Sequence, residues 1–173
     1  KRLITKMHKL TDTSIKLFID RLDKSGVGIS LMQNESVCLV PYTLPGEKVK
    51  ANIINKFKSK LYCSHLEILE NSSERSNNTC EHFTKCGGCL LQHWQYENYK
   101  QWKFNLIRQP LLKLTPDIKT LDMISADNYS RRRAKFFLRQ DNNSCKLGFK
   151  KYKSETLINI NNCIIIDPEI MAF

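Results

Sequence analysis

Three cysteines stand close together in the middle of the chain. Cys80, Cys86 and Cys89 fall within ten residues, and Gly87 and Gly88 fill the gap between the last two. Cysteine thiolates bind zinc and iron, and a C-x-x-C loop with glycines can turn two sulfurs toward one centre. Such a cluster in a polar segment favours a metal site over buried, apolar thiols. Three thiolates leave a four-coordinate site incomplete, and the candidates for the fourth ligand are Cys163, Cys145, His82 and His93.

The spacing by itself leaves the identity of the metal open. Zinc ribbons usually carry two short C-x-x-C loops, and this chain has one. Iron–sulfur clusters accept four thiolates at more varied spacings, so the pattern favours iron–sulfur slightly over zinc. Cys38 and Cys63 are interpreted as small core residues, because no histidine or acid is positioned by sequence to activate them.

The number of cysteines also bears on the compartment. Seven is an odd number, and the chain has neither a secretion signal nor a stretch of about 18 apolar residues that could span a membrane. This pattern disfavours a disulfide framework and predicts reduced thiols in a cytoplasmic protein with no membrane partner. We expect a monomer.

The charge balance predicts a polyanionic partner. The chain carries 28 Lys and Arg against 17 Asp and Glu, which gives a formal net charge of +11. Between residues 131 and 153, nine basic side chains face a single acidic one, Asp141. A charge run is often only a solvated surface, but a concentration this strong favours nucleic acid.

Residues 10–70 have the pattern of short β-strands joined by turns. Ile15, Leu17 and Ile19 alternate with mostly polar neighbours, as half-buried strands do. Further strand-like runs lie at residues 27–29, 36–40, 49–53 and 61–69. Turn sequences separate them, among them Asp23-Lys24-Ser25-Gly26 and Leu44-Pro45-Gly46-Glu47. Five strands at this spacing predict a small closed barrel.

The rest of the chain divides into a polar stretch, a helix and a second strand region. Residues 71–79 contain no apolar side chain and are the best linker candidate. A helix is predicted over residues 96–112, with Tyr99, Trp102 and Leu106 on one face, and Pro110 should end or kink it. Further strands are predicted at residues 135–139, 146–150 and 156–160.

The cysteine segment resembles a known cluster motif. In residues 80–93 the first cysteine is followed by five residues, then Cys86-Gly87-Gly88-Cys89, then two leucines and Gln92-His93. This arrangement resembles the cluster motif of bacterial RNA (uracil-5-)-methyltransferases, especially those acting on 23S ribosomal RNA. Residues 44–49 resemble a turn of the TRAM domain, an OB-like barrel that binds RNA. Residues 129–135 resemble the Tyr-Arg-Arg-Arg segment of the family's central domain.

The resemblance implies a ligand set, a cofactor and a reaction. The family's fourth cysteine follows in an Ile-x-x-Cys context, which Cys163 matches with 73 residues between it and Cys89. A 4Fe-4S cluster on Cys80, Cys86, Cys89 and Cys163 is therefore implied, in place of Cys145 or zinc. The resemblance also implies S-adenosylmethionine-dependent synthesis of 5-methyluridine. The catalytic domain would lie beyond Phe173, so this chain alone is expected to be inactive.

A fold and a domain plan follow from the same resemblance. The fold is expected to be mainly β with one long helix. Residues 1–70 would form the TRAM barrel and residues 71–95 a linker with the cluster motif. Residues 96–113 would form a helix that docks on the catalytic domain. Residues 114–173 would begin a small α+β central domain with an antiparallel sheet.

RNA contacts are expected from basic and aromatic side chains. Cations neutralise phosphates, and aromatic rings stack on unpaired bases. The expected contact residues are Arg131, Arg132, Arg133, Lys135, Lys56, Lys58, Lys60, Phe83 and His93. Trp94 and Phe136 are interpreted as core residues. The alternative reading of the whole chain is a stand-alone RNA-binding protein with a structural zinc site.

Overall fold

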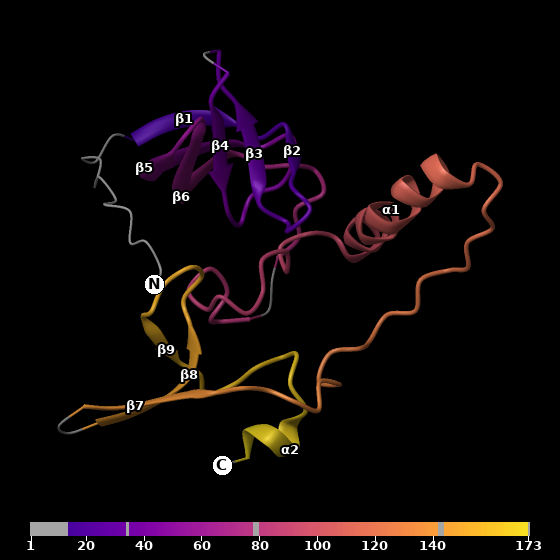
Figure 1. Ribbon diagram of the computed structural model, residues 1–173. Coiled ribbons are helices and arrows are strands. Elements are labelled where there is room, and N and C mark those ends of the chain that lie inside the picture. Colours follow the sequence, from indigo (N-terminus) through magenta and orange to yellow (C-terminus); the bar gives the residue numbers. More distant parts are fainter. Residues whose placement is uncertain (1–13, 34, 78–79, 142–143, 173) are drawn as a thin grey trace, which may run out of the picture. The chain divides into compact units, whose positions relative to one another are not determined.

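The computed structural model describes residues 14–33, 35–77, 80–141 and 144–172. The chain forms two compact units. The first contains residues up to 76 together with 93–98, and the second contains residues 77–92 and those from 99 onward. Each unit is described by itself (Figure 1).

The first unit is a curled six-stranded sheet. Its strands are β1 (Ser14–Phe18), β2 (Arg21–Leu22), β3 (Gly28–Leu31), β4 (Val37–Val40), β5 (Lys48–Phe57) and β6 (Lys60–Glu70). Their order in the sheet is β1-β5-β6-β4-β3-β2. Only the β4–β6 pair is parallel among the described strand pairs, and the other neighbours are antiparallel. This unit contains the five predicted strands, and it adds a short sixth strand, β2, that the pattern did not predict.

The sheet curls because the chain crosses between its two edges within two residues. The Ile19 N–H donates to the Glu47 carbonyl beside β5, at 2.9 Å, and the Asp20 N–H donates to the Ile29 carbonyl in β3, at 2.8 Å. Ile19 is itself fully buried. The alternating apolar residues of the strands face one core, which consists of Leu17, Ile19, Cys38, Val40, Val49, Ala51, Leu61 and Cys63. The two cysteines interpreted as core residues therefore lie in the core.

The polar stretch after β6 is bound to this unit over its first half. The Ser76 N–H donates to the His93 carbonyl at 2.8 Å, and the Gln95 N–H donates to the Glu74 carbonyl at 2.9 Å. The Trp94 indole N–H also donates to the Glu74 carboxylate at 2.7 Å. Residues 73–76 and 93–95 thus form a hydrogen-bonded stem, and the cysteine segment leaves from its end. Residues 78 and 79 lie outside the described part of the chain.

The second unit contains a three-stranded antiparallel sheet. Its strands are β7 (Phe137–Asp141), β8 (Ser144–Lys150) and β9 (Leu157–Asn159), in the order β7-β8-β9. A one-turn helix, α2 (Pro168–Met171), follows. The first strand begins two residues later than predicted. Arg131 lies outside the named strands, in an isolated parallel bridge with Ile166, so the arginine run is not part of the sheet.

The helix α1 (Tyr96–Leu114) begins in the first unit and continues in the second. It runs four residues past Pro110, although the proline was expected to end or kink it. No residue of α1 is buried, and Tyr99 and Trp102 lie with ring centroids 6.4 Å apart. None of the helices in the described part of the chain is long and apolar enough to cross a membrane.

Candidate metal centre

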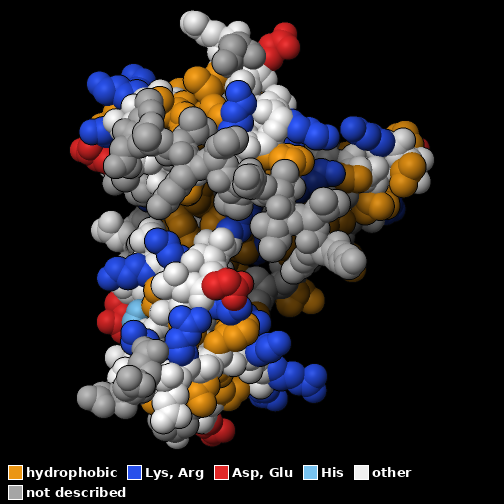
Figure 2. Space-filling view, turned by 60° about the vertical axis from the view of Figure 1, so that its left-hand side comes forward, with side chains coloured by type: hydrophobic (Ala, Val, Ile, Leu, Met, Phe, Trp, Pro, Cys, Tyr) orange, Lys and Arg blue, Asp and Glu red, His pale blue; other side chains and the backbone are white. Residues whose placement is uncertain are grey.

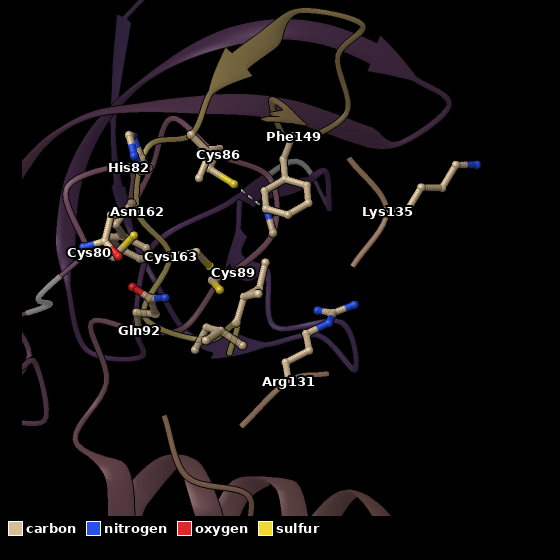
Figure 3. Close-up of a pocket in the computed structure, with 15 residues that line it drawn as sticks. Cys80, His82, Cys86, Cys89, Gln92, Arg131, Lys135, Phe149, Asn162 and Cys163 are labelled. Carbon is tan, nitrogen blue, oxygen red and sulfur yellow. Dashed lines mark hydrogen bonds between the residues drawn. The ribbon is translucent and has the colours of Figure 1, made fainter. Parts of the chain in front are cut away.

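The four predicted ligands line one cavity in the second unit. Cys80, Cys86, Cys89 and Cys163 surround a space of about 300 Å³ (Figure 3). All four thiols are half-buried. Cys86 and Cys89 each interact electrostatically with Cys80 and Cys163, so the four thiols lie close to one another. The structure therefore brings together Cys89 and Cys163, which have 73 residues between them in the sequence.

Local hydrogen bonds shape the loop that carries the first three cysteines. The Phe83 N–H donates to the Cys80 carbonyl at 3.1 Å, and the Cys86 N–H donates to the His82 carbonyl at 2.8 Å. These bonds fold residues 80–86 into consecutive turns. Cys163 follows β9, whose register against β8 is set by antiparallel pairing. One wall of the cavity thus comes from a turn and the other from the end of a sheet.

Gly87 allows this loop to approach β8 closely. The Gly87 N–H donates to the Lys150 carbonyl at 3.0 Å. A Cβ atom on Gly87 would lie 2.7 Å from the Tyr152 nitrogen and 2.8 Å from the Lys150 oxygen, which is too close for any side chain. Neither Gly87 nor Gly88 has a positive φ angle, since the described glycines with positive φ are Gly26 and Gly46. The glycines were predicted to permit backbone turns, but Gly87 serves close packing instead.

Two of the sulfurs accept hydrogen bonds. The Gly88 N–H donates to Cys86 Sγ at 3.3 Å. The side-chain amide of Gln92 donates to the thiol sulfur of Cys89. Such donors stabilise a thiolate and are common around metal-bound cysteine. In the sequence, Gln92 stood out only as part of the motif of residues 80–93. Its position three residues after Cys89 did not predict this contact.

Burial controls the ionisation of the same two thiols. Burial raises the pKa of the Cys86 thiol, an effect that the Gly88 N–H opposes and that charges on Cys80 and Cys163 reinforce. Burial likewise raises the pKa of Cys89, against the hydrogen bond from Gln92. The thiols are therefore neutral near pH 7 without a nearby cation. A bound cation would reverse this, because it favours the thiolate.

Other candidate ligands lie elsewhere or in the cavity wall. Cys145 is exposed on β8. His93 is fully buried in the first unit, while His82 lines the cavity. Within residues 14–33, 35–77, 80–141 and 144–172, no group of three or more His, Cys, Asp or Glu side chains is arranged so that it could hold a metal ion.

A basic and aromatic wall completes the cavity. Arg131, Lys135 and Phe149 also line it, and in Figure 3 the Lys135 side chain points away from the cysteines. Phe149 stacks on Phe136, with ring centroids 4.9 Å apart. The Lys150 ammonium lies 4.7 Å from the Phe137 ring centroid. Figure 2 shows Lys and Arg side chains among hydrophobic ones over the region of β7 to β9.

The predicted RNA contacts fall into exposed and buried sets. The basic ones are all exposed: Arg131, Arg132, Arg133, Lys135, Lys56, Lys58 and Lys60. The guanidinium of Arg131 also donates to the Arg133 carbonyl at 2.9 Å. Phe83 is only 9% exposed and His93 is 0% exposed, so neither ring presents a face to solvent. Trp94 is buried too, as the core interpretation expects.

Sequence comparison connects the chain with RNA-modifying enzymes. No family model matches the chain. It is 34% identical over 157 residues to an uncharacterised RNA methyltransferase of Brucella melitensis, covering 91% of this chain and 36% of that protein. It is 31% identical over 173 residues to the 23S rRNA (uracil(1939)-C(5))-methyltransferase RlmD of Vibrio cholerae, covering 96% of this chain and 39% of that enzyme. By sequence, the chain belongs to the family of RNA methyltransferases.

The fold agrees with this assignment. The structure is similar to that of Pyrococcus abyssi tRNA (uracil-54, C5)-methyltransferase, solved in complex with S-adenosyl-L-homocysteine, with a TM-score of 0.60 and 20% identity. The similarity covers 90% of this chain and 34% of that enzyme. The chain thus spans little more than a third of the length of these RNA methyltransferases.

Proposed function

We propose that this chain is the RNA-binding and iron–sulfur N-terminal portion of an S-adenosylmethionine-dependent RNA (uracil-5-)-methyltransferase that acts on 23S ribosomal RNA. The observation that carries the proposal is the convergence of Cys80, Cys86, Cys89 and Cys163 on one cavity, in a chain whose relatives include 23S rRNA (uracil-C5) methyltransferases. Methyl transfer would belong to the two thirds of the relatives that this chain does not cover.

The residues around the cavity suit a 4Fe-4S cluster. Four thiols are the ligand set that such a cluster requires, and two of their sulfurs already accept hydrogen bonds. A cube of four irons also holds its thiolates farther apart than one metal ion does. A single zinc ion with bonds of about 2.3 Å would bring the sulfurs to within roughly 4 Å of one another.

The cluster would act as a cross-link. When bound, it would join the loop of residues 80–89 to the end of the β8–β9 hairpin at Cys163. The chain between Cys89 and Cys163 is 73 residues long, and closing a long loop removes much conformational entropy from the unfolded state. The hydrogen bond from the Gly87 N–H to the Lys150 carbonyl would hold the cysteine loop against β8 before the cluster binds.

RNA binding would use the exposed cations of both units. The run Arg131–Arg133, with Lys135, lies beside the cavity in the second unit, and Lys56, Lys58 and Lys60 lie in the first. Neutralised phosphates would make the affinity strongly dependent on salt. The apolar side chains that α1 leaves exposed would dock on the remainder of the enzyme.

Anaerobic reconstitution with iron and sulfide tests the cluster. We expect about four iron atoms per chain, with the visible absorption of an iron–sulfur cluster. Cys163→Ser should lose most of the iron, whereas Cys145→Ser, which changes an exposed thiol outside the cavity, should retain it. A colourless protein with one tightly bound zinc would favour the zinc alternative and contradict the proposal.

A further inference from the structure

The tip of the β5–β6 hairpin in the first unit exposes an aromatic ring that the core does not use. Phe57 is the last residue of β5 and pairs with Lys60, the first of β6. Its side chain is 53% exposed, as is that of Ile54. Solvent-exposed apolar side chains are common singly, but an exposed aromatic ring beside a hairpin turn offers a flat surface to a partner.

Three lysines lie within three residues of Phe57 in the sequence. Lys56, Lys58 and Lys60 are all exposed, and the Lys58 ammonium lies 5.7 Å from the Phe57 ring centroid. Over the described residues none of the three forms an ion pair. No described carboxylate therefore neutralises their charge, which makes the three lysines candidates to bind an anionic partner.

The turn between the two strands holds one of these lysines, Lys58, in a strained backbone conformation. Lys58 and Ser59 form the connection between the strands, and Lys58 has a φ of 53°. Two-residue hairpin turns strongly prefer Asn, Asp or Gly at such positions, because a larger side chain is strained there. The turn therefore holds an exposed lysine in a left-handed backbone conformation.

Single-stranded nucleic acid fits this combination of groups. Proteins that bind single strands use aromatic rings on which bases stack and cations that follow the phosphates. The stacked bases of a duplex would not be available to the ring. A protein partner would also bury an apolar side chain, but charged residues are depleted in the core of protein interfaces, and here three lysines lie within three residues of the ring.

We propose that Phe57 is a stacking platform for an unpaired base of the RNA, with Lys56, Lys58 and Lys60 holding the flanking phosphates. This inference rests on the proposed function and deepens it. It also replaces Phe83 and His93, the two predicted stacking residues that the structure buries, by a ring that is exposed.

Binding of a fluorescent single-stranded oligouridine, measured at several salt concentrations, tests the proposal on the full chain with its cluster reconstituted. Phe57→Ala should weaken binding by about 5- to 100-fold, while the slope of log affinity against log salt stays the same. Phe57→Trp, which keeps an aromatic ring at this position, should bind with the affinity of the wild type. Phe18→Ala is the matched control, since Phe18 is 49% exposed on β1 of the same sheet, and it should bind like the wild type.

Lys58→Asn separates charge from folding. Asn suits the left-handed turn, so the midpoint of thermal unfolding should be unchanged or higher. The slope against salt should nevertheless fall by about 0.7, because one phosphate contact is lost. Wild-type affinity in Phe57→Ala would overturn the inference and leave the proposed function intact. No binding by the wild-type chain would contradict the proposed function, and the inference with it.

Discussion

Both oxygens of the Glu47 carboxylate accept hydrogen bonds from the guanidinium of Arg75. Arg75 Nη2 donates to Oε2 at 2.9 Å, and Arg75 Nε donates to Oε1. Glu47 is fully buried, and it also accepts the Leu44 N–H at 2.8 Å. Arg75 in turn donates to the Tyr42 carbonyl at 3.2 Å. This pair ties residues 72–76, from which the cysteine segment departs, to the curled sheet.

Removing one partner of this pair should destabilise the first unit strongly. Arg75→Ala leaves the Glu47 carboxylate buried without its counter-charge, which typically costs about 3–5 kcal/mol. We expect the free energy of unfolding, measured by urea titration of the first unit's transition, to fall by about 3 kcal/mol. Lys48→Ala removes a cation from an exposed pair with Glu70 and should cost well under about 1 kcal/mol. Equal effects of the two substitutions would contradict this account.

The same pair predicts a dependence of stability on pH. Burial by itself raises the pKa of Glu47, but the hydrogen bonds from Arg75 and the Leu44 N–H, with the charge of Arg75, outweigh it and hold the pKa below its ordinary value of 4.5. The stabilisation is therefore present above pH 4.5 and is lost as the pH falls through the lower folded value. Unfolding free energies measured between neutral and acid pH should fall more steeply below pH 4.5 in the wild type than in Glu47→Gln. Glu67→Gln, an exposed carboxylate on β6, should follow the wild-type curve.

The two neighbouring glycines of the cysteine loop should respond differently to a methyl group. Gly87→Ala places a Cβ against the backbone of Lys150 and Tyr152, so the loop must move away from β8. Gly88→Ala meets only Cys86 Sγ at 3.4 Å, which is ordinary contact. We expect iron incorporation to drop several-fold in Gly87→Ala and to stay close to wild type in Gly88→Ala. Elemental analysis after reconstitution measures both, and equal iron contents would show that close packing at Gly87 is not needed.

The arginines of the run should have different roles: Arg132 should serve RNA binding alone, and Arg131 should also stabilise the local structure. Arg132 is exposed, so Arg132→Gln should reduce the salt slope of RNA affinity by about 0.7 and leave unfolding unchanged. The Arg131 guanidinium bonds the Arg133 carbonyl, and its backbone pairs with Ile166. Arg131→Gln should therefore lower the thermal midpoint by a few degrees as well as weaken binding. Circular dichroism and filter binding on the same variants distinguish the two effects.

Local patterns in the sequence were enough to predict several elements. The alternation of Ile15, Leu17 and Ile19 predicted β1, because side chains on a strand face opposite sides at every step. The Asp23–Gly26 turn is also where it was expected, with the Asp23 carboxylate accepting the Ser25 and Val27 N–H groups at 2.8 and 2.9 Å. These features depend on neighbours within a few residues, so they are present in the sequence itself.

Tertiary structure decided whatever depends on distant residues. The spacing of the cysteines left Cys163 and Cys145 as rivals and the resemblance pointed to Cys163. The fold places Cys163 in the cavity wall and Cys145 on an exposed strand. Phe83 and His93 were predicted to contact RNA, yet both are buried by parts of the chain that no local pattern identifies. The polar composition of residues 71–79 suggested a linker, but Glu47, 28 positions before Arg75, binds this stretch through hydrogen bonds to Arg75. Composition and hydrophobic periodicity indicate which local structure a segment prefers. The burial of a residue and its hydrogen-bond partners depend on which distant groups the folded chain brings to it.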